Sequence, residues 1–386
     1  MRKLWLTFCQ TATVCLAVLF VISTLRPDLL ASAPQGEVVT VKESQREEAR
    51  PAAQVTSFNS AARKAMPAVV NIYTSQEVKR PRQPLMDDPV FRYFFGEQGD
   101  PAVQRREGLG SGVIVSDKGY VLTNHHVVES VDQIEVALAD ARKVPARVVG
   151  TDPDTDLAVL KIDLPRLPAI TFGNSDQVQV GDVVLAIGNP FGVGQTVTLG
   201  IVSALGRTQL GITTFESFIQ TDATIQPGNS GGALVDTSGN LVGINTAIYS
   251  QSPRGESMGI GFAIPVSIAR QVMEQIVRDG SVTRGWIGVG GRDITRELAE
   301  TLQITAGRGA LITQVVRGGP ADQAGVKPGD VLVGVNGSAV GDWGAVLNQV
   351  AALKPGDQAK LKLLRENANT EVAVTIGRRP RATKRE

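Results

Sequence analysis

Short apolar runs rich in valine and isoleucine alternate with Gly, Asp and Asn over most of the chain. Such runs between turn-forming residues predict β-strands. One lies at Ala68–Thr74, and after a long gap the others follow at 113–115, 120–123, 144–149, 157–162, 183–187, 196–204, 218–220, 233–235, 241–246 and 260–264. Two stacked antiparallel barrels of about six strands each would account for this series, so we expect a mainly β fold.

The first clear helical pattern comes directly after these strands. Its apolar residues are four apart and share one face: Ile268, Val272 and Ile276. Pro265 precedes the pattern and Gly280 follows it, which is the usual asymmetry of proline at a helix start and glycine past its end. We therefore place a domain boundary here and expect a first domain over residues 58–280.

Residues 281–380 predict a second, smaller domain of the α+β class. Strands are expected at 286–289, 310–315 and 331–335, with two more ending near 376, and helices at 296–303 and 343–353. Residues 381–386 form a charged tail.

The N-terminal end is apolar from residue 4 to residue 25 and begins with the basic residues Arg2 and Lys3. About 20 apolar residues are enough to span a bilayer, and basic residues on the short side favour a cytoplasmic end. We therefore expect residues 1–25 to be an uncleaved anchor in the inner membrane, inserted through residues 4–25.

A cleaved signal peptide is the alternative, because Ala31–Ala33 resembles a cleavage site. Pro34 would directly follow the cut, which counts against it. Residues 26–57 are polar and charged and predict a flexible tether. Residues 75–107 read as a long insertion with little periodicity. Its aromatic cluster at 91–95 is expected to pack on another surface, and the sequence leaves open whether that surface is the same domain, a neighbouring subunit or a substrate.

Composition excludes several classes of function. Lys and Arg number 39 and Asp and Glu 38, without a long basic block, so we expect no nucleic-acid binding. The two cysteines, Cys9 and Cys15, both lie in the N-terminal apolar stretch, so the domains must fold without a disulfide. The two histidines, His125 and His126, are adjacent and diverge on a regular backbone, which argues against a metal site that uses both.

Two motifs that suggest other ligands fail on inspection. The glycines of 108–112 are not followed by a helix, so a nucleotide site is not expected. Asp152, Asp154 and Asp156 imitate the start of a calcium loop, but Leu157 stands where that loop needs glycine. We therefore expect no metal and no cofactor.

A serine between glycines suggests acyl-transfer chemistry. Ser230 lies in Gln226–Leu234, where small residues allow a sharp turn that presents a hydroxyl and backbone N–H groups to one point. A serine nucleophile needs a base, and His125 and His126 are the only histidines. Asp156 heads an apolar strand, where a carboxylate is costly without a partner such as an imidazole.

Three motifs in one order make the signal specific. They are TNHHVV at 123–128, TDLAVLKI at 155–162 and GNSGGAL at 228–234. Together they resemble the trypsin-like serine proteases of the HtrA family, and the resemblance runs from about residue 61 to residue 380. It implies a trypsin-like double β-barrel protease domain.

The resemblance implies a role for individual residues. The family's general base corresponds to His126, its orienting acid to Asp156 and its nucleophile to Ser230. His, Asp and Ser in this chain order also match the chymotrypsin arrangement. The backbone N–H groups of Gly228 and Ser230 would form the oxyanion hole.

Specificity and control are implied less directly. Trypsin-like enzymes that cut after Lys or Arg carry an aspartate six residues before the nucleophile, and here Thr224 stands there beside Ile225. This predicts a small, neutral S1 pocket suited to Val or Ala. Arg207 matches the arginine of the family's allosteric sensor loop.

The second domain resembles a bacterial PDZ domain. The segments that carry the resemblance are Arg284–Val289 and Gly325–Leu332. A glycine-containing loop can bind a peptide's terminal carboxylate, and the peptide then adds a strand beside the helix at 343–353. The predicted peptide-binding residues are Arg284, Trp286, Ile287, Gly288 and Val289.

One anchor and one PDZ domain resemble the membrane-anchored DegS or AlgW type. That type implies a periplasmic homotrimer that is activated by C-termini of misfolded outer-membrane proteins and cleaves a membrane-bound anti-sigma factor. The long insertion is more like the DegP or DegQ quality-control type, so a general protease and chaperone is the alternative. A PDZ adaptor without proteolysis is an alternative of another class.

Overall fold

The computed structural model describes residues 5, 10, 13, 14, 17, 42–43, 57–79, 103–189, 194–208, 210–248, 259–301 and 308–380. The chain divides into two units, residues 1–38 and 39–386. The predicted anchor, apart from five single residues, lies outside the described part, as do most of the tether, residues 91–95 and the tail at 381–386. Within the described part, no helix has both the length and the apolar character needed to cross a membrane.

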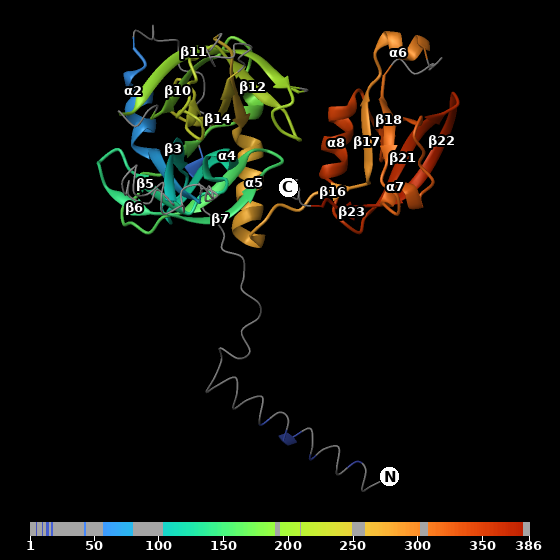
Figure 1. The fold of residues 1–386 in the computed structure, drawn as a ribbon, viewed down its shortest axis with the longest axis horizontal. Helices are drawn as coiled ribbons and strands as arrows, with labels where there is room; N and C mark the ends of the chain where they lie inside the picture. Colours follow the sequence, from blue (N-terminus) through green and yellow to red (C-terminus); the bar gives the residue numbers. More distant parts are fainter. Residues whose placement is uncertain are drawn as a thin grey trace, which may run out of the picture. The chain divides into compact units, whose positions relative to one another are not determined.

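The first domain contains two mainly antiparallel sheets, in which only β9 pairs in parallel, with β1 and β14 (Figure 1). The first sheet has seven strands, and β2 and β3 pair as a long hairpin at its centre. In spatial order the strands are β6 (Lys143–Pro145), β5 (Gln133–Ala137), β2 (Val69–Lys79), β3 (Val103–Ile114), β4 (Tyr120–Asn124), β8 (Leu157–Lys161) and β7 (Arg147–Asp152).

The second sheet has eight strands and closes on itself. Its order is β1 (Lys42–Glu43), β9 (Thr171–Phe172), β14 (Leu241–Ile248), β13 (Ala233–Val235), β10 (Val183–Gly188), β11 (Thr196–Arg207), β12 (Phe218–Thr221) and β15 (Gly261–Pro265). Because β15 also pairs with β14, the six strands β14, β13, β10, β11, β12 and β15 form a closed ring. This barrel agrees with the fold expected from the strand pattern.

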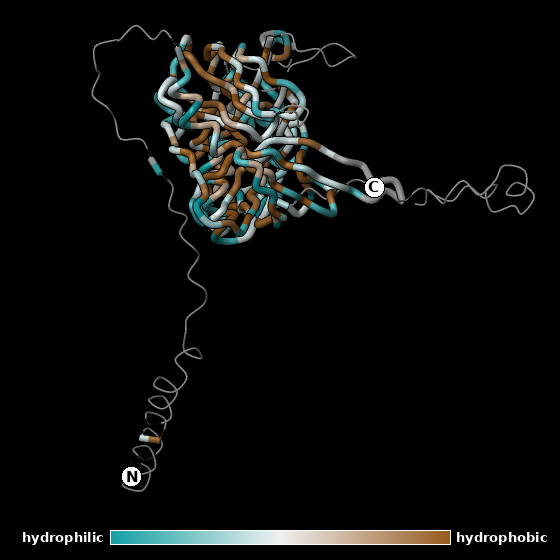
Figure 2. Tube along the Cα trace, turned by 90° about the vertical axis from the view of Figure 1, so that its left-hand side faces the viewer, coloured by the Kyte–Doolittle hydropathy of each residue, from teal (hydrophilic) through white to brown (hydrophobic). Residues whose placement is uncertain are grey.

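A continuous apolar core joins the two sheets. It includes fully buried residues from both, such as Val113, Leu122, Ile187 and Ile244. The apolar face of α5 (Val266–Asp279) packs on the same core through Ala269, Val272, Met273 and Ile276, and Figure 2 shows the hydrophobic segments inside this domain.

Helix α5 confirms the helical pattern. Gly280 has φ +70° and donates its N–H to the Ile276 carbonyl at 2.8 Å, so glycine ends the helix in the left-handed conformation.

The second domain has its own core and is α+β, as expected. Its main sheet runs β17 (Val289–Asp293), β18 (Ala310–Val315), β19 (Val331–Val335), β21 (Gln358–Arg365) and β22 (Ala368–Thr375), with β20 (Ser338–Ala339) beside β19. Strands β16 (Gly285–Trp286) and β23 (Gly377–Arg378) form a separate pair. The helices are α6 (Arg296–Thr301), α7 (Pro320–Gln323) and α8 (Trp343–Ala351).

The structure corrects the sequence prediction at a few places. The insertion expected over residues 75–107 is partly strand, because β2 continues to Lys79 and β3 begins at Val103. This hairpin is held by paired backbone groups, which leave no hydropathy pattern. Helix α2 (Asn59–Ala65), the 3₁₀ turns at Met66–Ala68 and Ser175–Gln177, and strand β5 were also missed by the pattern.

Candidate active site

His126 lies where the first sheet gives way to a single helical turn. Strand β4 ends at Asn124, and α4 (His125–Val128) follows at once. The Nδ1 atom of His126 is 2.8 Å from Asp156 Oδ2, and its backbone N–H donates to Asp156 Oδ1 at 3.0 Å. With Nδ1 engaged by a carboxylate, we assign its proton there, which leaves Nε2 as the basic atom.

Asp156 ends the turn before β8 and is held by its own backbone. Its φ is +57°, in the left-handed region that aspartate tolerates. Its carbonyl accepts the His125 N–H and the Asn124 side-chain amide, both at 3.0 Å. Because β4 and β8 pair directly, His126 and Asp156 stand at the same end of two adjacent strands.

The carboxyl group of Asp156 is ionised in this setting. Burial alone would raise its pKa. The hydrogen bonds from His126 and Thr246, together with the electrostatic attraction of the imidazole, outweigh burial and hold the pKa below the ordinary value of 3.8. The Thr246 hydroxyl donates to Asp156 Oδ2 at 2.7 Å.

Ser230 lies in the nucleophile loop, defined here as residues 226–232. Its hydroxyl donates to the carbonyl of Thr246 at 3.1 Å. Ser230 and His126 are both described, and the structure records no hydrogen bond between them. Thr246 therefore contacts both the acid and the nucleophile, and a rotation of the Ser230 side chain is needed before His126 can take its proton.

Thr246 was missed by the sequence analysis. It is 3% exposed near the end of β14, a mostly apolar strand that also carries the buried Asn245. A buried hydroxyl needs a hydrogen-bond partner, so a threonine in such a strand could have indicated a polar contact inside the domain. The partner itself is distant in the sequence.

The nucleophile loop holds its backbone in a conformation that leaves two N–H groups without an acceptor among the described residues. Gly228 and Gly231 have φ values of +97° and +82°, which favour glycine. Neither residue 228 nor residue 230 donates its backbone N–H to any described acceptor, whereas the N–H groups of Asn229, Gly231 and Gly232 are all bonded. Two backbone N–H groups without an acceptor, next to a serine hydroxyl, can stabilise the oxyanion of an acyl-transfer reaction.

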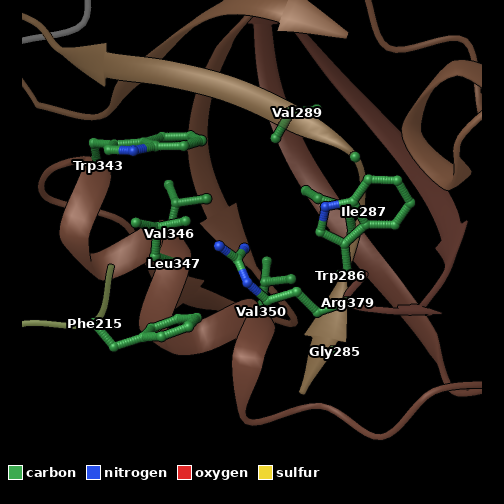
Figure 3. A pocket seen from close by; sticks show the side chains of 11 residues that line it. Phe215, Gly285, Trp286, Ile287, Val289, Trp343, Val346, Leu347, Val350 and Arg379 are labelled. Carbon is green, nitrogen blue, oxygen red and sulfur yellow. The ribbon is translucent and has the colours of Figure 1, made fainter. Parts of the chain in front are cut away.

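The second domain carries a narrow apolar groove (Figure 3). Four of the predicted peptide-binding residues line it: Trp286, Ile287, Gly288 and Val289. Trp343, Val346, Leu347 and Val350 of α8 line the other side. The space between them is about 20 Å³, which is room for about one water molecule, so a peptide side chain must widen the groove to enter.

Comparisons with known proteins agree with both domains. Residues 110–244 match the trypsin-like peptidase domain family, and residues 285–376 match the PDZ domain family. A solved structure described as "HtrA-type protease AlgW with decapeptide" is 52% identical with a TM-score of 0.73, and the match covers 85% of this chain and 100% of that one. The chain belongs to the HtrA family of serine proteases.

Other HtrA proteins are similar over most of the chain. A probable periplasmic serine endoprotease, DegP-like, of Chlamydia trachomatis is 49% identical over 300 residues, or 76% of this chain and 60% of the relative. That of Chlamydia pneumoniae is 46% identical over 339 residues, or 84% and 69%. A serine endoprotease structure from Yersinia pestis is 42% identical with a TM-score of 0.63, covering 84% and 99%.

The chain thus spans only about 60% of the length of the C. trachomatis relative. The family matches fall inside the predicted domains at 58–280 and 281–380, whose limits stay predictions.

The predicted S1 residues and the predicted sensor arginine of this HtrA chain have different surroundings. Thr224 is exposed, and its carbonyl accepts the Thr198 hydroxyl at 2.8 Å. Ile225 is 1% exposed within a core cluster of the second barrel. Arg207 lies at the end of β11 and donates to Gln220 Oε1 at 2.8 Å in an exposed position. The S1 and sensor roles of these residues stay predictions.

Arg284 requires a correction, because it does not line the groove. Both of its terminal nitrogens lie 2.6 Å from the carboxylate of Asp152, which is 4% exposed. Its guanidinium also stacks over the Phe215 ring at 4.7 Å from the centroid. A buried carboxylate requires a cation, and the forked guanidinium satisfies both oxygens, so we reassign Arg284 from peptide binding to this ion pair.

The acids that imitated a calcium loop each have a separate partner. Asp152 pairs with Arg284, Asp154 pairs with Arg379 at 3.1 Å, and Asp156 with His126. Over the residues that the structure describes, no cluster of three potential metal ligands occurs.

Proposed function

We propose that this protein is a periplasmic serine endopeptidase whose activity is controlled by peptides bound at its PDZ domain. The observation that supports proteolysis most strongly is the juxtaposition of His126, Asp156 and Ser230 around Thr246. The periplasm is supported by the names of the DegP-like relatives.

The proposed reaction uses the side chains of Ser230, His126 and Asp156. Ser230 turns its hydroxyl from the Thr246 carbonyl towards Nε2 of His126 and attacks the scissile carbonyl carbon, while His126 accepts the proton. Asp156 keeps the Nδ1 proton in place and stabilises the imidazolium. The N–H groups of Gly228 and Ser230 bind the oxyanion, and His126 then protonates the leaving amine. Water repeats the sequence on the acyl-enzyme.

The proposed control site is the groove of the second domain. Gly288 has φ +77° at the turn before β17, as suits a loop that points N–H groups at a terminal carboxylate. The apolar walls of the groove suit a hydrophobic last side chain. The similar AlgW structures are described as complexes with a decapeptide and a tripeptide, which supports peptide binding here.

The finer assignment follows the resemblance to the DegS or AlgW type. We propose a homotrimer anchored to the inner membrane through residues 4–25, activated by C-termini of misfolded outer-membrane proteins, with a membrane-bound anti-sigma factor as substrate. The second candidate is a DegP-like quality-control protease, favoured by the relatives named DegP-like. A PDZ adaptor without proteolysis is disfavoured by the intact His126–Asp156 pair.

One experiment separates these functions. The full-length chain in detergent is assayed on unfolded casein and on a fluorogenic peptide panel, with and without peptides that carry varied hydrophobic free C-termini. Cleavage of the panel only when such a peptide is added supports the regulated protease, and unprompted digestion of casein supports quality control. No cleavage under any condition contradicts both and leaves the adaptor. Within the panel, faster cleavage after Arg than after Val would contradict the neutral S1 pocket.

A further inference from the structure

We propose that Ser111 is a positioning residue that holds the nucleophile loop in its reactive conformation. Ser111 lies on β3, far in sequence from Ser230, and is 0% exposed. It contacts neither the substrate nor the reacting atoms. The inference deepens the proposed endopeptidase function and rests on it.

The hydroxyl of Ser111 both donates and accepts a hydrogen bond. It donates to the carbonyl of Gly228 at 2.6 Å and accepts the backbone N–H of Asn189 at 2.8 Å. A hydroxyl is the smallest side chain that can donate and accept at once. Alanine would occupy the same place but leave a buried carbonyl and a buried N–H without partners.

The backbone of Ser111 holds the same loop at a second point. Its N–H donates to the Ser230 carbonyl at 2.8 Å, and its own carbonyl accepts the Thr123 hydroxyl at 2.7 Å. That carbonyl also lies so close to Gly231 that a side chain there would collide with it. One residue of β3 therefore holds the loop at 228 and 230 and is itself fixed by β4, the strand that leads to His126.

The contact at Gly228 matters because of what glycine permits. The peptide unit between Gly228 and Asn229 is held at both ends, its carbonyl by Ser111 and its N–H by the Gln226 carbonyl at 2.9 Å. Without the hydroxyl, Gly228 has few steric limits to rotation. A rotation about the bonds of Gly228 would let the loop backbone shift on both sides of it, including the preceding peptide unit that carries the Gly228 N–H, and so weaken binding of the transition state more than binding of the substrate.

The test compares Ser111→Ala with the unaltered full-length chain. The assays are cleavage of a fluorogenic peptide with Val before the cut and binding of a peptide boronate, which forms a tetrahedral adduct with serine. Losing one oxyanion donor outright costs about 10²–10³ in rate, so a loosened donor should lower kcat by about 10- to 100-fold. We expect KM within about twofold and boronate affinity reduced by a factor similar to kcat.

The matched control is Ser116→Ala, which removes a buried hydroxyl that bonds Asp117 and lies outside the nucleophile loop. It should leave kcat, KM and boronate affinity unchanged.

A folded Ser111→Ala chain with unaltered kcat and boronate affinity would overturn the proposal, as would a loss confined to KM. If Ser111→Ala does not fold, Ser111→Thr keeps the hydroxyl and must retain kcat, and a folded threonine variant as slow as the expected alanine variant also overturns it. Unaltered protein that neither cleaves nor binds the boronate contradicts the proposed function itself.

Discussion

The nucleophile loop and the PDZ groove are organised in opposite ways. In the loop, Ser111, Thr246 and neighbouring backbone groups hold the main chain and the Ser230 hydroxyl, while the N–H groups of Gly228 and Ser230 have no acceptor among the described residues. The groove is apolar and almost closed, with about 20 Å³ between its walls. The first site is prearranged and needs only a side-chain rotation, whereas the second must open to bind. We therefore expect peptide binding at the groove to regulate activity and the nucleophile loop to carry out catalysis.

The largest expected effect removes the nucleophile. Ser230→Ala should lower kcat by a factor on the order of 10⁴ to 10⁶, because the remaining oxyanion donors cannot supply the covalent step. The melting temperature should stay close to that of the unaltered chain, and peptide binding at the groove should not change. The measurement is peptide cleavage beside calorimetry, with the exposed Ser203→Ala on β11 as control. A Ser230→Ala chain that still cleaves would contradict the assignment of Ser230 as the nucleophile.

Thr246→Val tests whether the missed threonine belongs to that site. The substitution keeps the shape and the main-chain carbonyl but removes the hydrogen bond to Asp156. Hydrogen bonds to charged groups contribute about 1.5–3 kcal/mol, so kcat should fall by about tenfold to a hundredfold. Thr221→Val is the control, since its hydroxyl is equally buried but bonds the Ile201 carbonyl. Equal kcat in the two variants would show that Thr246 is only structural.

The groove is tested by a charge placed on α8. Leu347→Glu puts a carboxylate beside the expected position of the peptide's own carboxylate and last side chain. We expect affinity for a hydrophobic C-terminal peptide to fall by about tenfold or more, because like charges and a desolvated acid both oppose binding. Leu347→Met is the control. Calorimetric titration measures the affinity, and basal cleavage should be equal in all three chains; unchanged affinity would place the peptide elsewhere.

The smallest effect concerns the acidity of Asp156. Because folding lowers its pKa, the group contributes stability that is fully present above about 3.8 and is lost as pH falls through the lower folded value. The difference in free energy of unfolding between the unaltered chain and Asp156→Asn should therefore be constant above about pH 5 and shrink below 3.8. Denaturant unfolding at several pH values measures it. A difference that grows towards acid pH would mean that burial, and not His126, dominates this carboxyl.

Local patterns predicted much of the fold. Apolar runs located most strands, and Pro265 and Gly280 bracketed α5, because burial and backbone conformation leave marks within a few residues. The motifs located His126, Asp156 and Ser230, which the structure brings to one place.

Features that depend on distant partners were not predictable. Thr246 and Ser111 have meaning only beside Asp156 and Gly228, which are remote in sequence. Arg284 was expected in the groove because it belongs to the segment Arg284–Val289 that resembles a PDZ domain, but a carboxylate at Asp152 binds it instead. The strand extensions at Lys79 and Val103 are set by backbone pairing, which side-chain hydropathy does not record.

The segment from Asp152 to Asp156 has a further consequence for how this chain can vary. Asp152 and Asp154 pair with Arg284 and Arg379, near the first and last residues of the PDZ domain, and Asp156 bonds the imidazole of His126. Its length is thereby fixed, since a single inserted or deleted residue would misalign either the arginine anchors or the general base. A change in the length of this segment would therefore disturb the attachment of the PDZ arginines and the orientation of His126 together.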